Sequence, residues 1–141
     1  MKNRIQNYIL ILVTVIFVPL IILKVLSFYP LDFYTVAGVS LIALGTVFIV
    51  IARFQLGGSF SIKAEARELV TRGLYSRVRH PIYVFGGMLI LGMVLCVRSI
   101  PLLSLWLLLM ILQVRRAGKE DRVLEEKFGE AYRKYREGTW F

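Results

Sequence analysis

Two groups of side chains in this sequence stand out as able to bind a ligand: Tyr75, Arg79, His80 and Tyr83, then Arg116, Glu120 and Asp121. Carboxylates accept hydrogen bonds from ammonium and hydroxyl groups, a guanidinium holds an anion, and a phenol ring covers a flat or cationic group. Taken singly, each residue also has a structural explanation, such as an interfacial tyrosine or a histidine at a helix N-cap. Whether these residues form one site depends on the helices and loops that carry them.

Apolar segments of membrane-spanning length surround both groups. Residues 5–23 and 33–52 carry no charge, and two further apolar runs, 81–97 and 99–114, are separated only by Arg98. With 57% hydrophobic residues and a mean hydropathy of +0.69, the chain is more apolar than ordinary soluble domains.

The prediction is an all-α integral membrane bundle of about four transmembrane helices. We expect them near residues 5–26, 33–53, 81–97 and 99–115. The last two would form a short hairpin, and its length leaves open whether it crosses the bilayer completely. We therefore expect a single domain, residues 1–141, with polar regions at 57–83 and 115–136.

The basic residues are distributed unequally around these segments. Of the eighteen Lys and Arg residues, only Lys24 and Arg98 fall in the loops expected on one side of the membrane. The positive-inside rule therefore places both termini and the middle loop in the cytoplasm, and we expect a prokaryotic inner membrane. The net charge of +9 is then explained by topology, and nucleic-acid binding is disfavoured because no recognition motif accompanies the basic residues.

Several common motifs are missing from the sequence. There is no P-loop, dinucleotide fingerprint, soluble-methyltransferase glycine loop or zinc-type motif, and the single cysteine, Cys96, cannot form an intramolecular disulfide. The first apolar segment is too long for a signal peptide and has no small-residue cleavage site. We therefore expect a retained transmembrane helix and no metal.

The C-terminal polar stretch has helical periodicity. Leu124, Phe128, Ala131 and Tyr135 recur at helical spacing between charged residues, which predicts an amphipathic helix on the polar side of the bundle. Pro81 suits the first position of a helix, which would put His80 at its N-cap. The Gly86–Gly87 pair favours close helix packing, or leaves room for a ligand beside the backbone.

Two sequence blocks resemble a known family. LVTxGxYxxxRHPxY runs from Leu69 to Tyr83, and RxxxEDxxLxxxFGxxYxxY runs from Arg116 to Tyr135. Both closely resemble the isoprenylcysteine carboxyl methyltransferase family, within a wider group that includes the phospholipid N-methyltransferases. The resemblance covers roughly residues 57–135 and implies a membrane methyltransferase that uses S-adenosylmethionine and releases S-adenosylhomocysteine.

The resemblance also implies the site residues. The cofactor contacts carried over to matching positions are Arg67, Glu68, Leu69, Val70, Tyr75, His80, Pro81, Ile82, Tyr83 and Glu120. Arg116 corresponds to an arginine implicated in binding the acceptor, so Arg116 and Glu120 are the expected catalytic residues. Methyl transfer from a sulfonium needs alignment and desolvation more than an acid or a metal. Arg116 favours an anionic acceptor, a lipophilic carboxylate or thiol, reached among membrane lipids.

Departures from the family pattern keep other functions open. Asp121 replaces the usual second glutamate, and the chain ends at Trp140-Phe141 without the proline-containing tail common in the family. A prenylated protein is therefore a poor candidate acceptor, and a phospholipid amine remains an alternative. An NADPH-dependent protein similar to sterol reductases and a non-catalytic membrane scaffold are further alternatives. The sequence leaves the acceptor and the oligomeric state undetermined.

Overall fold

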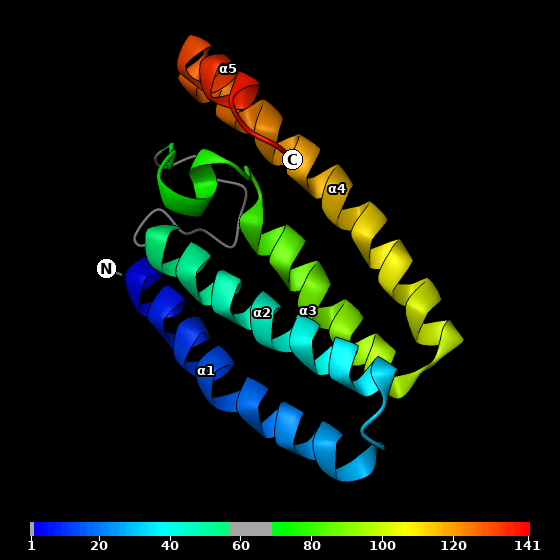
Figure 1. Ribbon diagram of the computed structural model, residues 1–141. Coiled ribbons are helices and arrows are strands. Elements are labelled where there is room, and N and C mark those ends of the chain that lie inside the picture. Colours follow the sequence, from blue (N-terminus) through cyan, green and yellow to red (C-terminus); the bar gives the residue numbers. More distant parts are fainter. Residues whose placement is uncertain (1, 57–68) are drawn as a thin grey trace.

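The computed structural model describes residues 2–56 and 69–141, with side chains from residue 5 onward (Figure 1). Its helices are α1 (Lys2–Phe28), α2 (Phe33–Leu56), the short 3-10 helix η2 (Gly73–Ser76), α3 (Pro81–Val97), α4 (Ile100–Phe128) and α5 (Glu130–Glu137). Within these residues the only β-type pairing is an isolated bridge between Val78 and Trp140. The predicted all-α bundle is confirmed.

Three helices are long and apolar enough to cross a membrane, judged by length and composition. They are Ile5–Phe28, Phe33–Leu56 and the helix Ile100–Phe128, whereas α3, Pro81–Val97, is a shorter apolar helix. The outward surfaces of the long helices carry large exposed apolar side chains, for example Leu12 and Phe17 of α1 and Leu108 of α4. In water such a surface would be unfavourable, but lipid tails can cover it. The fold therefore fits a membrane protein.

Helix α3 lies between α2 and α4 (Figure 1). Its contact with α2 depends on glycines that let the two backbones approach closely. A Cβ on Gly92 would lie 2.5 Å from the main-chain oxygen of Gly38, and one on Gly45 would lie 2.9 Å from that of Phe85. Cys96, which is fully buried, belongs to the small apolar core at this contact. This packing holds α3, and with it the residues at its N-terminus.

The turn between α3 and α4 makes the predicted hairpin. Arg98 adopts a left-handed conformation (φ 55°) at the end of α3, and its guanidinium pairs with Asp32 in the α1–α2 loop. Ser99 then caps α4 by accepting a hydrogen bond from the Leu102 amide. The two loops far from the polar stretches are thus tied to one another.

Helix α4 differs from the helix expected at residues 99–115. It continues to Phe128, because the residues after Arg115 are good helix formers and Arg116 pairs with Glu120 one turn on. Gly129, with φ 54°, ends it. The expected C-terminal amphipathic helix is consequently divided between the end of α4 and α5.

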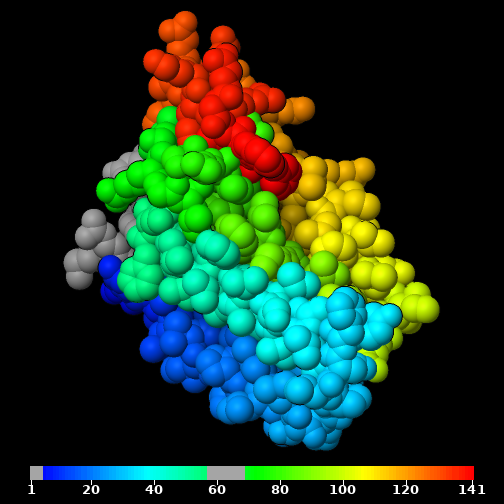
Figure 2. Space-filling view, viewed as in Figure 1, coloured from blue at the N-terminus to red at the C-terminus, as the bar shows by residue number. Residues whose placement is uncertain are grey.

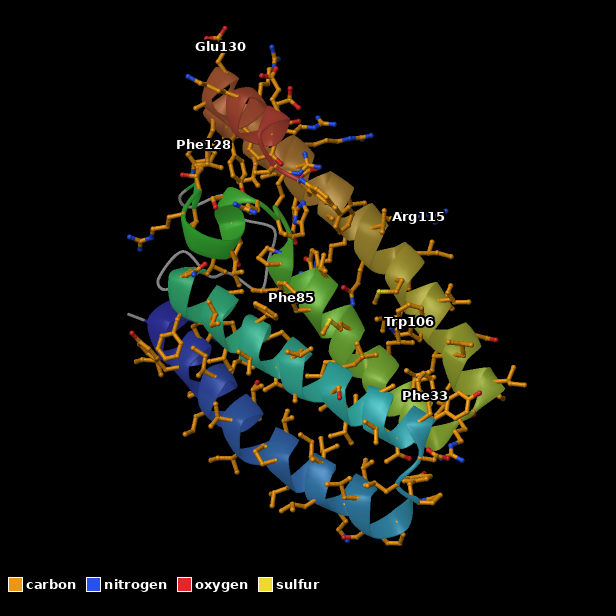
Figure 3. All side chains as sticks on the ribbon, in the orientation of Figure 1. Phe33, Phe85, Trp106, Arg115, Phe128 and Glu130 are labelled. Carbon is orange, nitrogen blue, oxygen red and sulfur yellow. The ribbon has the colours of Figure 1, made fainter. Side chains whose placement is uncertain are left out.

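The division at Gly129 also changes which face of α5 is buried. Ala131, expected on the buried face, is exposed, and Tyr132 is buried instead, with 1% of its surface accessible. Charged side chains gather around α5 and the adjoining half of α4, above the apolar part of the bundle (Figure 3). The start of α1 lies at this end too, since Asn7 Nδ2 donates to the Arg53 carbonyl at 2.8 Å.

Candidate functional site

The candidate site lies at this polar end, where α3 begins beside the polar half of α4. Pro81 occupies the first turn of α3 and His80 its N-cap, with φ −120° and ψ 58°. The His80 side chain makes no capping hydrogen bond. It is therefore available to α4, and only 8% of the residue is accessible.

His80 is held by a carboxylate of α4. Its Nε2 lies 2.8 Å from Asp121 Oδ1, and the Tyr132 hydroxyl donates to the same oxygen at 2.5 Å. The guanidinium of Arg79 is 3.9 Å from Asp121 Oδ2. Burial and the hydrogen bond to Asp121 raise the pKa of Tyr132 above its ordinary value, so this phenol stays a donor at neutral pH. Asp121 thus joins α3, α4 and α5.

A second cluster forms around Glu120. The Tyr83 hydroxyl donates to Glu120 Oε1 at 2.5 Å, and Arg116 Nε lies 3.4 Å from the same oxygen. Glu120 Oε2 is 3.8 Å from His80 Nδ1. The His80 and Tyr83 rings are stacked with centroids 5.7 Å apart, and the Arg116 guanidinium lies 5.9 Å from the Tyr83 ring centre. Four of the expected site residues are therefore neighbours.

Tyr75 approaches this cluster from η2. It is buried, with 7% of its surface accessible, and its carbonyl accepts a hydrogen bond from the Tyr135 hydroxyl at 2.5 Å. Burial raises the pKa of Tyr75, while the positive charge of Arg53 opposes the rise. Gln55 positions η2 by accepting a hydrogen bond from the Leu74 amide at 2.7 Å.

The remaining expected cofactor residues have no ionisable side chains or fall outside the described residues. Leu69 and Val70 are half-buried just before η2, Pro81 is buried, and Ile82 is half-buried in the first turn of α3. Arg67 and Glu68 lie outside the residues that the structure describes. The four described residues can contribute apolar surface and main-chain groups.

Gln113 was missed by the sequence reasoning, although it is a polar residue inside an apolar run. Trp106, Met110 and Gln113 share one face of α4, and the first two contact Gly87 of α3; the Trp106 ring donates to the Gly87 carbonyl at 2.9 Å. Gln113 continues that face toward Glu120. Its Oε1 is buried without a hydrogen-bond partner among the described residues.

In residues 2–56 and 69–141, no three His, Cys, Asp or Glu side chains are grouped as metal ligands. The polar groups of the two clusters are a pair of carboxylates, two guanidinium groups, an imidazole and phenols. That set suits an organic ligand with ammonium, hydroxyl and aromatic groups.

Fold and site together define a helical membrane protein with a polar cluster at one end. The model of the family described as phospholipid methyltransferase matches residues 33–131, from the start of α2 into α5. The chain therefore belongs to the phospholipid methyltransferase family, which confirms the resemblance found in the two sequence blocks. No curated protein matches the chain. The matched residues include the whole Glu120 cluster and, of the residues around Asp121, all but Tyr132.

Proposed function

We propose that the protein is an S-adenosylmethionine-dependent methyltransferase that acts, as a single domain, on a lipophilic acceptor in the membrane. The observation that carries this proposal is the contact of Glu120 with Tyr83, Arg116 and His80 within the region matched by the family. Membership of the family supports methyl transfer in general. The choice of cofactor and acceptor rests on the chemistry of these side chains.

The residues of the cluster fit this cofactor. Glu120 can accept hydrogen bonds from its ammonium or ribose hydroxyls, and the stacked rings of His80 and Tyr83 can lie against its purine or sulfonium. In the first turn of α3, the Ile82 amide can meet a carboxylate, whereas the Tyr83 and Val84 amides donate to the His80 carbonyl. The proposed cofactor contacts are Arg67, Glu68, Leu69, Val70, Tyr75, His80, Pro81, Ile82, Tyr83 and Glu120.

When bound, S-adenosylmethionine supplies a methyl group on a positively charged sulfur. The protein's own contribution is alignment and exclusion of water, because direct displacement at this carbon needs neither an acid nor a metal. Glu120 and His80 orient the cofactor, and Arg116 faces the methyl acceptor. The proposal needs no metal ion.

Arg116 favours an anionic acceptor, a lipophilic carboxylate or thiolate. Its side chain is 53% accessible and is the most exposed member of the Glu120 cluster, so a substrate can reach it. A phospholipid amine is the second candidate. The carboxylates of Glu120 and Asp121 favour it, because they can attract an ammonium group and Glu120 can take up its proton.

For the orientation, we propose that both termini face the cytoplasm of a prokaryotic cell. Arg53 at the end of α2 and the basic residues of α5 lie at the site end of the bundle, whereas Lys24 and Arg98 belong to the opposite end. The positive-inside rule assigns the more basic end to the cytoplasm. A reporter that is active only in the cytoplasm, fused after residue 141, tests this orientation.

The cofactor assignment is tested by calorimetric titration of detergent-purified protein with S-adenosylhomocysteine and, separately, with NADPH. We expect binding of the first ligand only, and a loss of about a hundredfold in affinity for Glu120→Ala, because a charged hydrogen-bond partner is removed. Glu126→Ala, an exposed glutamate of the same helix, is the matched control. Binding of NADPH alone would indicate a reductase, and binding of neither ligand would favour a scaffold.

A further inference from the structure

The segment Gly138–Phe141 turns back from α5 and lies against the chain just before α3 (Figure 2). The Trp140 amide donates to the Arg77 carbonyl at 2.7 Å. In return, the Arg79 amide donates to a main-chain oxygen of Phe141 at 2.9 Å, and the His80 amide reaches the same oxygen at 3.4 Å. The Arg79 amide also reaches the Trp140 carbonyl at 3.2 Å, and this bond together with the one from the Trp140 amide to Arg77 makes the isolated bridge between Val78 and Trp140.

Main-chain atoms, not large side chains, hold this segment in place. The Trp140 residue is 79% accessible, so its ring contributes little to the contact. The Phe141 ring is nearer the site, with its centre 5.8 Å from that of the His80 imidazole. Thr139 secures the base of the segment by donating from Oγ1 to the Tyr135 carbonyl at 3.0 Å.

The Gly138–Phe141 segment contacts the backbone of His80, whose side chain belongs to both clusters of the site. His80 has an irregular backbone conformation, and α3 holds only its carbonyl, which accepts hydrogen bonds from the Tyr83 and Val84 amides, while its side chain makes no cap. Asp121 restrains the imidazole from one side. The Gly138–Phe141 segment restrains the backbone of Arg79 and His80 from the other.

We propose that Gly138–Phe141 is a positioning strap for His80. When docked, it holds the turn before α3 so that the imidazole meets Asp121 and stacks on Tyr83, which completes the cluster around Glu120. The effect on cofactor affinity rests on the proposed function, whereas the effect on His80 does not. Trp140 acts through its amide and Phe141 through its main-chain oxygen and ring.

The test uses the fact that His80 is the only histidine in the chain. In protein without a histidine tag, selective ¹⁵N labelling gives one imidazole whose nitrogen shifts report the bond to Asp121. Trp140→Pro removes the amide that donates to Arg77. The matched control Trp140→Ala keeps that amide and removes only the exposed ring.

We expect Trp140→Pro to shift the imidazole signal and to lower affinity for S-adenosylhomocysteine by about tenfold, since small displacements of site groups have effects of this size. Trp140→Ala should keep the wild-type signal and affinity. An unchanged signal in Trp140→Pro, or the same shift in Trp140→Ala, would overturn the strap. A shifted signal with unchanged affinity would overturn its role in cofactor binding.

A second variant guards against loss of folding in the proline substitution. Phe141→Ala leaves every main-chain bond and removes the ring beside His80, so a smaller shift of the imidazole signal is expected at an unchanged melting temperature. No shift in either variant contradicts the proposal. If wild-type protein fails to bind S-adenosylhomocysteine, the proposed function fails, and the imidazole signal still decides whether the strap positions His80.

Discussion

The two faces of α3 meet their neighbours in different ways. Toward α2, glycines bring the backbones together, and Gly92 leaves no space for a Cβ. Toward the polar half of α4, long side chains bridge the gap, as Tyr83 does to Glu120 and His80 to Asp121. The first contact resists change, whereas the second consists of polar groups that, in our proposal, exchange partners when the cofactor binds. The tightly packed α2–α3 pair thus supports His80 and Tyr83, whose polar contacts with α4 can change.

Crowding the α2–α3 contact should have the largest effect. In Gly92→Ala the new Cβ would lie 2.5 Å from the Gly38 carbonyl and 2.8 Å from Ile42 Cγ1. Because a main-chain atom cannot move aside cheaply, we expect a loss of about 3 kcal/mol in the free energy of unfolding. Thermal unfolding in detergent measures it.

The control for that substitution lies on the same helix. A Cβ on Gly86 would meet nothing within 4 Å, so Gly86→Ala should be neutral or stabilise the protein by about 0.5–1 kcal/mol. Equal destabilisation by the two substitutions would mean that the α2–α3 contact is no tighter than the rest of the helix surface.

Asp121→Asn should have the next largest effect, because it removes the charge that holds His80, Tyr132 and Arg79 together. Hydrogen bonds to a charged group contribute about 1.5–3 kcal/mol each, so we expect a loss of about 2 kcal/mol in stability. Melting curves with and without S-adenosylhomocysteine measure the change. Glu126→Gln, an exposed residue of the same helix, should behave as wild type.

Arg116→Ala tests whether binding of the cofactor and reaction with the acceptor depend on different residues. Because Arg116 is half-exposed and faces the acceptor in our proposal, we expect unchanged affinity for S-adenosylhomocysteine and about tenfold slower methyl transfer. Binding is measured by calorimetry, and turnover with labelled cofactor on an acceptor panel of lipophilic carboxylates, thiols and phospholipid amines. Loss of cofactor affinity equal to that in Glu120→Ala would contradict the division of roles.

Much of this arrangement could be predicted because its signals are local. Hydropathy identified the apolar helices, and the spacing of His80, Tyr83 and Glu120 in two motifs identified the cluster. The end of α4 could not be placed by hydropathy, since the helix continues through charged residues until Gly129. Phe141 is joined to Arg79 and His80 by main-chain hydrogen bonds, and because any residue type can make such bonds, the sequence does not indicate this contact.

Gln113 lies on α4 between the apolar contact of Trp106 and Met110 with Gly87 and the polar cluster around Glu120, and the smallest effect is expected here. Its Oε1 is buried without a partner among the described residues, so Gln113→Leu should stabilise the protein by about 1 kcal/mol. If the acceptor's polar head reaches this oxygen along the α3–α4 contact, the same change should slow methyl transfer about threefold and leave cofactor affinity unchanged. A stabilised variant with full turnover would show that Gln113 has no part in acceptor binding.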